Sequence, residues 1–313
     1  MTLLHKLLHL TNFKNPLLQT LVPSVAASFA IQAAFAIPSI AFQSERFYDL
    51  SGSLTYLTVT ALSLSLPGIR ARHVAQQAGG SLLSSAANGG LLSWRSILLS
   101  GAVAIWATRL GSYLFQRVLQ EGHDSRFDEI KKSPPRFLVA WMAQAVWVSV
   151  CLMPVIAINS IPVSIFSSSL KPTDIIGLSL YAGGILLEVA ADRQKAQWSR
   201  EKHAKKHSEE FLTKGLWSKS RHPNYFGEVA LWTGIATTAA GVLISSSPIR
   251  TALGLSRLGA LGLCYASPAF VTFLLLKVSG VPLSEEKYDK RFGDRKEYQE
   301  WKRNTPMFFP KLF

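Results

Sequence analysis

Long apolar runs alternate with short polar segments along most of the chain. A helix needs about 20 predominantly apolar residues to cross the hydrocarbon core of a bilayer. Seven runs approach or meet that length, at residues 17–37, 50–66, 96–118, 137–158, 174–191, 227–244 and 254–278. The pattern therefore predicts an all-α fold, a polytopic membrane helical bundle of about seven transmembrane helices.

The polar segments suggest how the chain is divided. Residues 1–16 mix basic side chains with leucines, which suits a short amphipathic piece in the membrane interface. The Ala-rich end of the first run resembles a signal-peptide cleavage region, but the many later runs favour a retained span. Residues 68–93 are rich in Gly, Ser, Ala and Gln and predict a flexible loop. We expect an N-terminal region over residues 1–95, with two spans and this loop, and a membrane domain over residues 96–313.

Composition supports a membrane protein. The chain has 313 residues, of which 48% are hydrophobic and 17% charged, whereas a soluble domain averages about 25% charged residues. Cys151 and Cys264 lie inside apolar runs and are typical of small buried hydrophobic residues rather than of a disulfide framework or metal site. The net charge is +14, but the basic stretches are interleaved with the apolar runs, so nucleic-acid binding is not indicated.

The distribution of basic residues predicts the orientation. Seven spans put the two ends of the chain on opposite sides of the membrane. Most of the 33 Lys and Arg residues follow the first, third, fifth and seventh runs. The positive-inside rule then places the C-terminal segment, residues 281–313, in the cytosol.

Residues 215–228, Gly-Leu-Trp-Ser-Lys-Ser-Arg-His-Pro-Asn-Tyr-Phe-Gly-Glu, join a basic segment to an apolar run. Pro223 disfavours helical geometry at His222 and suits the first position of a helix, so we expect a helix to begin there. Its free N–H groups would face Lys219, Arg221 and His222, which together make a site for an anion such as phosphate. The alternative is a well-capped helix at the membrane surface with ordinary basic neighbours.

A second polar helix face ends the fifth run. Glu188, Asp192 and Lys195 are spaced i, i+4 and i+7, so they share one side of a helix and could line a polar pocket. The alternative is solvation of a helix end with an Asp192–Lys195 pair, which explains Glu188 less well because it lies a full turn deeper. Residues 192–226 also hold nine Lys or Arg against four acidic residues.

A histidine pair and an arginine within an apolar run each allow a purely structural interpretation as well as a functional one. His203 and His207 are spaced i, i+4, but no carboxylate accompanies them and lysines stand between them, so we expect no metal site. Arg109 lies in the third run, where an arginine is either functional and paired or extends to the interface.

Four motifs, in order along the chain, resemble those of the DUF1295 branch of the steroid 5-alpha-reductase superfamily. They are residues 106–113, 188–195, 221–228 and 279–283, within a similarity that covers roughly residues 96–313. The wider superfamily also contains sterol reductases and the isoprenylcysteine carboxyl methyltransferases. Its members are helical proteins of the endoplasmic reticulum or, in bacteria, of the inner membrane, which implies an integral, multi-pass location and a role in lipid metabolism.

The resemblance implies an NADPH-dependent oxidoreductase that reduces a carbon–carbon double bond of a lipid-like enone or a sterol. NADPH enters such enzymes from the cytosol. The residues implied to contact the cofactor are Glu188, Asp192, Lys195, Arg200, Arg221, His222, Asn224, Tyr225, Glu285, Tyr288 and Arg291. In the steroid reductases an amide occupies the position of Glu188, so this carboxylate is a departure.

The chemistry also needs a group that meets negative charge on the substrate oxygen. Tyr113, which matches an aromatic residue near the cofactor, is a candidate catalytic donor. Glu228, one turn after Asn224, and Glu188 are further candidates if they are buried and protonated. The steroid reductases hold their substrate with an acid and a tyrosine from the N-terminal region. Neither has a clear counterpart in residues 1–95, so steroid specificity is not indicated.

Two other functions remain open from the sequence. The C-terminal segment also resembles the methyltransferase branch, which implies an S-adenosylmethionine-dependent membrane methyltransferase. A non-catalytic lipid- or sterol-binding protein that keeps the same fold is the third. The long basic stretch of residues 192–226 favours a cofactor with several phosphates, hence NADPH.

Overall fold

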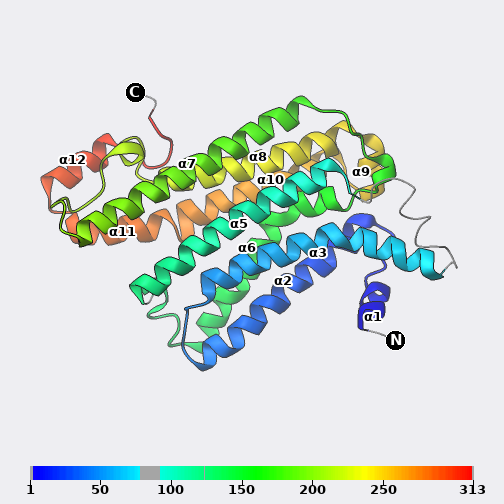
Figure 1. The fold of residues 1–313 in the computed structure, drawn as a ribbon, viewed down its shortest axis with the longest axis horizontal. Helices are drawn as coiled ribbons and strands as arrows, with labels where there is room; N and C mark the ends of the chain where they lie inside the picture. The colour runs from blue at the N-terminus through cyan, green and yellow to red at the C-terminus, as the bar shows by residue number, and fades with distance from the viewer. Residues whose placement is uncertain (1–2, 78–91, 123, 312–313) are drawn as a thin grey trace. The chain divides into compact units, whose positions relative to one another are not determined.

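Helices form nearly all of the regular structure in the computed structural model of this protein (Figure 1). The structure describes residues 3–77, 92–122 and 124–311, and within these ranges it contains no strand. The helices are α1 (Leu3–Leu10), α2 (Pro16–Ala41), α3 (Tyr48–Gln77), α5 (Trp94–Glu121), α6 (Pro134–Asn159), α7 (Pro172–His203), α8 (Pro223–Ser245), α9 (Ser247–Leu253), α10 (Arg257–Phe273), α11 (Val281–Phe292) and α12 (Lys296–Asn304). The predicted all-α class is confirmed.

Among the described residues, six helical segments are long and apolar enough to cross a membrane. They are Pro16–Ala41, Trp94–Gln120, Pro134–Asn159, Pro172–His203, Pro223–Ser245 and Arg257–Phe292. The second predicted span falls in α3, a helix of 30 residues that is rich in Ser and Thr. The six segments together with α3 agree with a polytopic bundle of about seven helices.

One boundary of the predicted loop at residues 68–93 is wrong, because α3 continues to Gln77. Arg70 explains the extension. Its guanidinium donates to the backbone oxygens of Leu8 at 3.0 Å and Gln19 at 3.1 Å, and to the hydroxyl of Thr11 at 2.5 Å. These bonds tie the end of α3 to the N-terminal helices. Residues 78–91 of the predicted loop lie outside the described residues.

The helices divide into two compact units. The first comprises Met1–Lys171 and Ala239–Ala266. In it, α2 packs chiefly on α6 and α3 chiefly on α5. Trp106 and Trp141 are among its largest fully buried side chains. The predicted division between residues 95 and 96 falls inside this unit and stays a prediction.

An ion-pair network lies at one end of the first unit. Glu45, in the turn between α2 and α3, accepts hydrogen bonds from Lys131 Nζ at 3.0 Å and from the backbone N–H of Asp124 at 3.1 Å. Arg126 Nη2 pairs with Asp49 at 2.9 Å and with Asp124 at 2.5 Å. The network therefore fastens the α2–α3 turn to the segment that joins α5 to α6. Burial alone raises the pKa of Glu45, but these hydrogen bonds hold it below its ordinary value.

The second unit comprises Pro172–Thr238 and Ser267–Phe313, and a seam of glycines joins α7 to α8 within it. A methyl group on Gly184 would lie 2.6 Å from the backbone oxygen of Gly227, and one on Gly234 would lie 2.4 Å from that of Gly177. Such approaches exclude any larger residue, as at other helix contacts built on small residues. Because the lower-numbered glycine of α7 meets the higher-numbered one of α8, the two helices are antiparallel.

Candidate cofactor site

The basic segment before α8 is folded against α7. Gly215 has a φ of +61°, a left-handed conformation that favours glycine. The next residue, Leu216, donates its N–H to Gln194 Oε1 at 2.9 Å, and Trp217 Nε1 donates to the backbone oxygen of Ala191 at 3.1 Å. The turn therefore brings the residues before Pro223 back to the polar end of α7.

Helix α8 begins at Pro223, which confirms the predicted start. Its first turn meets α7, because Asn224 Nδ2 donates to Asp192 Oδ1 at 3.1 Å. The ring of His222 stacks on that of Tyr225 with centroids 5.3 Å apart and planes 6° apart. Asp192 and His222 are both buried. The hydrogen bond between Asn224 and Asp192 therefore connects the polar face of α7 to the Arg-His-Pro-Asn-Tyr motif at the start of α8.

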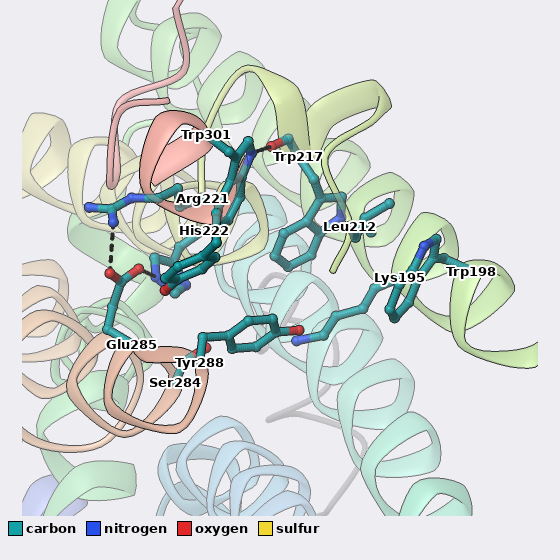
Figure 2. A pocket seen from close by; sticks show the side chains of 11 residues that line it. Lys195, Trp198, Leu212, Trp217, Arg221, His222, Ser284, Glu285, Tyr288 and Trp301 are labelled. Carbon is teal, nitrogen blue, oxygen red and sulfur yellow. Dashed lines mark hydrogen bonds and ion pairs between the residues drawn. The ribbon is translucent and has the colours of Figure 1, made fainter. Parts of the chain in front are cut away.

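Glu285, near the start of α11, gathers three basic groups. Arg221 Nη1 lies 2.7 Å from its Oε2 and His222 Nε2 lies 2.9 Å from its Oε1, as Figure 2 shows. Lys302 Nζ, from α12, lies 3.2 Å from Oε2. A single carboxylate thus links the segment before α8 to α11 and α12.

Burial and Glu285 act in opposite directions on His222. Burial lowers the pKa of the imidazole, the hydrogen bond to Glu285 raises it, and the net result is a pKa below the ordinary value. The ring is therefore neutral at neutral pH. A neutral imidazole that faces a carboxylate donates from the facing nitrogen, here Nε2, and leaves Nδ1 as an acceptor.

A pocket opens beside these groups (Figure 2). Its lining is Lys195, Trp198, Leu212, Trp217, Arg221, His222, Ser284, Glu285, Tyr288, Tyr298 and Trp301. The cavity measures about 30 Å³, room for one or two water molecules. A ligand of dinucleotide size therefore extends beyond it or requires its walls to separate.

Five of the eleven residues that line the pocket are Trp or Tyr, and contacts within the second unit hold several of them in place. Lys195 Nζ lies 5.0 Å from the ring centroid of Trp217. Trp301 Nε1 donates to the backbone oxygen of Trp217 at 3.4 Å, and the Tyr298 hydroxyl donates to Asp289 Oδ1 at 2.8 Å. Aromatic faces beside basic groups suit a ligand that carries both a flat ring and negative charge.

The buried polar atoms at the site that have no hydrogen-bond partner within the described part of the chain include Arg221 Nε and Asn224 Oδ1. The first is a donor suited to a phosphate oxygen. The second is an acceptor, because the amide nitrogen of Asn224 already donates to Asp192. NADPH presents phosphate oxygens and a carboxamide N–H, so these two atoms and the aromatic wall fit its chemistry.

The structure brings some of the sequence-predicted residues together and places others elsewhere. Lys195, Arg221, His222, Glu285 and Tyr288 line the pocket. Glu188 and Glu228 are buried on α7 and α8, where a methyl group on Gly227 would meet the backbone nitrogen of Glu188 at 2.8 Å. This contact continues the glycine seam to the turn of α7 that precedes Asp192.

The remaining predicted residues lie outside the pocket lining. Arg200 is exposed on α7. Arg291 has 64% of its side chain exposed, and its Nη2 lies 3.7 Å from Glu210 Oε2. Tyr113 belongs to the first unit, on α5, where the guanidinium of Arg109 lies 5.8 Å from its ring centroid. The functional roles assigned to these residues stay predictions.

Sequence reasoning did not select four of the aromatic residues: Trp198, Trp217, Tyr298 and Trp301. Tyr298 and Trp301 are spaced i, i+3 on α12, an otherwise strongly polar helix. An aromatic pair on one face of such a helix indicates a buried contact, and this signal was present in the sequence. Trp198 and Trp217, by contrast, lie on separate elements whose approach depends on the turn at Gly215.

Comparison with known proteins identifies the family. A family model described as "Protein of unknown function (DUF1295)" matches residues 77–305, which include every residue of the pocket lining. No curated protein and no solved structure matches the chain. Because the matched region covers most of the sequence, the protein belongs to the DUF1295 family, the steroid 5-alpha-reductase-like family.

Proposed function

We propose that this protein is an NADPH-dependent membrane oxidoreductase that reduces a carbon–carbon double bond of a lipid-like enone or a sterol. The observation that supports this most is that Arg221 Nε and Asn224 Oδ1, beside an aromatic and basic pocket, have no hydrogen-bond partner among the residues that the structure describes. Membership of the DUF1295 family adds support, because it suggests a steroid-reductase-like membrane protein.

The chain's own residues would divide the work of binding. Arg221 and Lys195 would hold phosphate groups, and the aromatic wall would stack on a ring. Asn224 would accept from the carboxamide, while Asp192 fixes the orientation of its amide. When bound, NADPH supplies the hydride, and the protein supplies binding, alignment and electrostatics.

The substrate half of the reaction needs a dry pocket and a donor for the developing negative charge. Glu228 is buried one turn along α8 from Asn224, so a protonated carboxyl there would make such a donor. Tyr113 is a second candidate on the resemblance alone, since it belongs to the first unit. An apolar substrate would reach the site from the lipid, and NADPH from the cytosol, where we propose that the C-terminal segment lies.

Binding of NADPH to the purified protein in detergent tests the proposal. We expect saturable quenching of tryptophan fluorescence, because three tryptophans line the pocket. Asn224→Ala should weaken binding about tenfold, since it removes a buried hydrogen bond. Asn304→Ala, an exposed position on α12, is the matched control. Unchanged affinity in Asn224→Ala would count against the proposed site.

Parallel titration with S-adenosylmethionine separates the competing functions. Binding of that cofactor in place of NADPH would favour a methyltransferase, and binding of neither would favour a non-catalytic membrane protein. Lipid profiling of a deletion strain addresses the substrate, because loss of a reductase should lead to accumulation of an unsaturated precursor.

A further inference from the structure

Residues 305–311, here called the C-terminal strap, lie along the segment that precedes α8. The backbone N–H of Arg221 donates to the oxygen of Pro306 at 2.9 Å, and the N–H of Lys311 donates to the oxygen of Lys219 at 2.9 Å. These bonds join parts of the chain that are more than 80 residues apart. They supply backbone partners to a segment that lies outside any helix, where an unpaired buried N–H would be costly.

Ser220 is at the centre of this contact and is fully buried. Its hydroxyl donates to the backbone oxygen of Phe308 at 2.9 Å and accepts from the backbone N–H of His222 at 3.1 Å. One hydroxyl thus connects the strap to the residue whose imidazole reaches Glu285. Alanine at this position would leave the N–H of His222 and the oxygen of Phe308 without that bond.

Aromatic packing fixes the strap to α8. The buried ring of Phe308 meets Phe226, in the first turn of α8, at a centroid distance of 5.6 Å. Phe309 meets the same ring at 5.6 Å, although most of its own surface is exposed. Phe226 therefore holds the strap at the start of the helix that carries Asn224.

We propose that Ser220 is a positioning residue that uses the C-terminal strap to hold Arg221 and His222 in the geometry needed to bind the cofactor. The proposal rests on the proposed function above. Among the described residues the Ser220 hydroxyl donates to the strap alone, so its effect on the ligand acts through Arg221 and His222. Arg221 and His222 both reach Glu285 from this one segment, and a shift of its backbone therefore moves both side chains.

The test compares Ser220→Ala with Ser218→Ala. Ser218 lies in the same segment but is only half-buried, and among the described residues its hydroxyl donates to the backbone oxygen of Gly215, within its own turn. We expect Ser220→Ala to weaken NADPH binding about five- to tenfold, the effect of one buried hydrogen bond, and Ser218→Ala to bind like the wild type. A chain truncated after Thr305 should lose a similar amount of NADPH affinity. Adding Ser220→Ala to the truncated chain should lower the affinity little further, because both changes remove the same contact.

Two readouts separate positioning from general stability. Hydrogen exchange at the amides of Arg221 and His222, measured without cofactor, should accelerate in Ser220→Ala while exchange in the first unit stays unchanged. The pH dependence of NADPH binding should also shift, because a loosened His222 becomes more exposed and its pKa moves back toward the ordinary value.

The outcomes distinguish this inference from the proposed function. Wild-type affinity in Ser220→Ala, or unchanged exchange at Arg221 and His222, would overturn the positioning role. If the wild type fails to bind NADPH, the proposed function falls. The exchange rates then decide alone whether Ser220 and the strap hold the segment, since they require no ligand.

Discussion

The side-chain amide of Asn224 donates to the carboxylate of Asp192 across 3.1 Å, although 32 residues separate the two in sequence. The pair lies just beyond the last glycine contact between the antiparallel helices α7 and α8, which Gly184 and Gly227 make. Gly184 and Gly227 bring the two backbones into contact, and the polar residues lie beyond them toward the basic segment. The geometry of the candidate site therefore depends on residues that touch no ligand.

A bulkier residue in the seam should disturb the site. We expect Gly184→Val to lower the free energy of unfolding by about 2 kcal/mol or more, because overpacking forces the helices apart, and to weaken NADPH binding. Gly183→Val is the control, since a Cβ added at Gly183 would meet no atom of the described residues within 4 Å. Thermal unfolding in detergent and NADPH titration provide the measurements. If the two variants have the same thermal stability and the same NADPH affinity, the close helix contact at Gly184 does not support the site.

The two members of the Asn224–Asp192 pair should act together. Asp192→Ala frees the amide that Asp192 orients, so its loss of NADPH affinity should resemble that of Asn224→Ala. In a double-mutant cycle we expect a coupling of about 1 kcal/mol, as for residues in direct hydrogen-bond contact. Additive losses would show that the carboxylate and the amide act on the ligand independently.

Arg221 should not be replaceable by lysine. Its Nη1 is hydrogen-bonded to Glu285, while its buried Nε has no partner among the described residues, and a single ammonium group cannot reproduce that fork. We expect Arg221→Lys to weaken NADPH binding about tenfold at unchanged charge. Arg303→Lys, an exposed position on α12, should leave it unchanged. Retained affinity in Arg221→Lys would mean that charge alone suffices at this position.

Stability should fall in mild acid because of His222. Burial lowers the pKa of this histidine in the folded protein from the ordinary 6.5, so the unfolded chain takes up the proton first. The stabilisation is complete above about pH 6.5 and is lost as the pH falls below that value. Thermal unfolding at pH 7.5 and 5.5 should show this loss in the wild type and less of it in His222→Gln. If the wild type and His222→Gln lose the same stability between pH 7.5 and pH 5.5, His222 is not the cause of the loss.

The ion-pair network of the first unit should contribute measurably to stability. Glu45→Gln removes a buried carboxylate that accepts from Lys131 and from the N–H of Asp124, and we expect it to lower the free energy of unfolding by about 1–3 kcal/mol. Glu129 makes an exposed pair with Lys132, so Glu129→Gln should cause no measurable change. Denaturant titration of both variants would test this difference.

Local features of the sequence predicted the helices correctly where interactions between residues close in sequence determine the structure. The apolar runs indicated the spanning helices, because only a helix satisfies its own backbone in lipid. Pro223 indicated the first residue of α8, because its ring restricts the residue before it. The same reasoning placed the end of α3 too early, since the extension depends on Arg70 bonding to residues far away in sequence.

The sequence by itself therefore determined the helical class, the family motifs and the presence of a basic segment next to an acidic helix face. Only the tertiary structure decided which of these groups meet. Glu285 joins Arg221 and His222 across 64 and 63 residues, and the aromatic pocket and the strap at Ser220 join segments still farther apart in sequence. Spacing along a helix fixes neighbours within one or two turns. Contacts between helices depend instead on packing, here on glycines that let α7 and α8 touch.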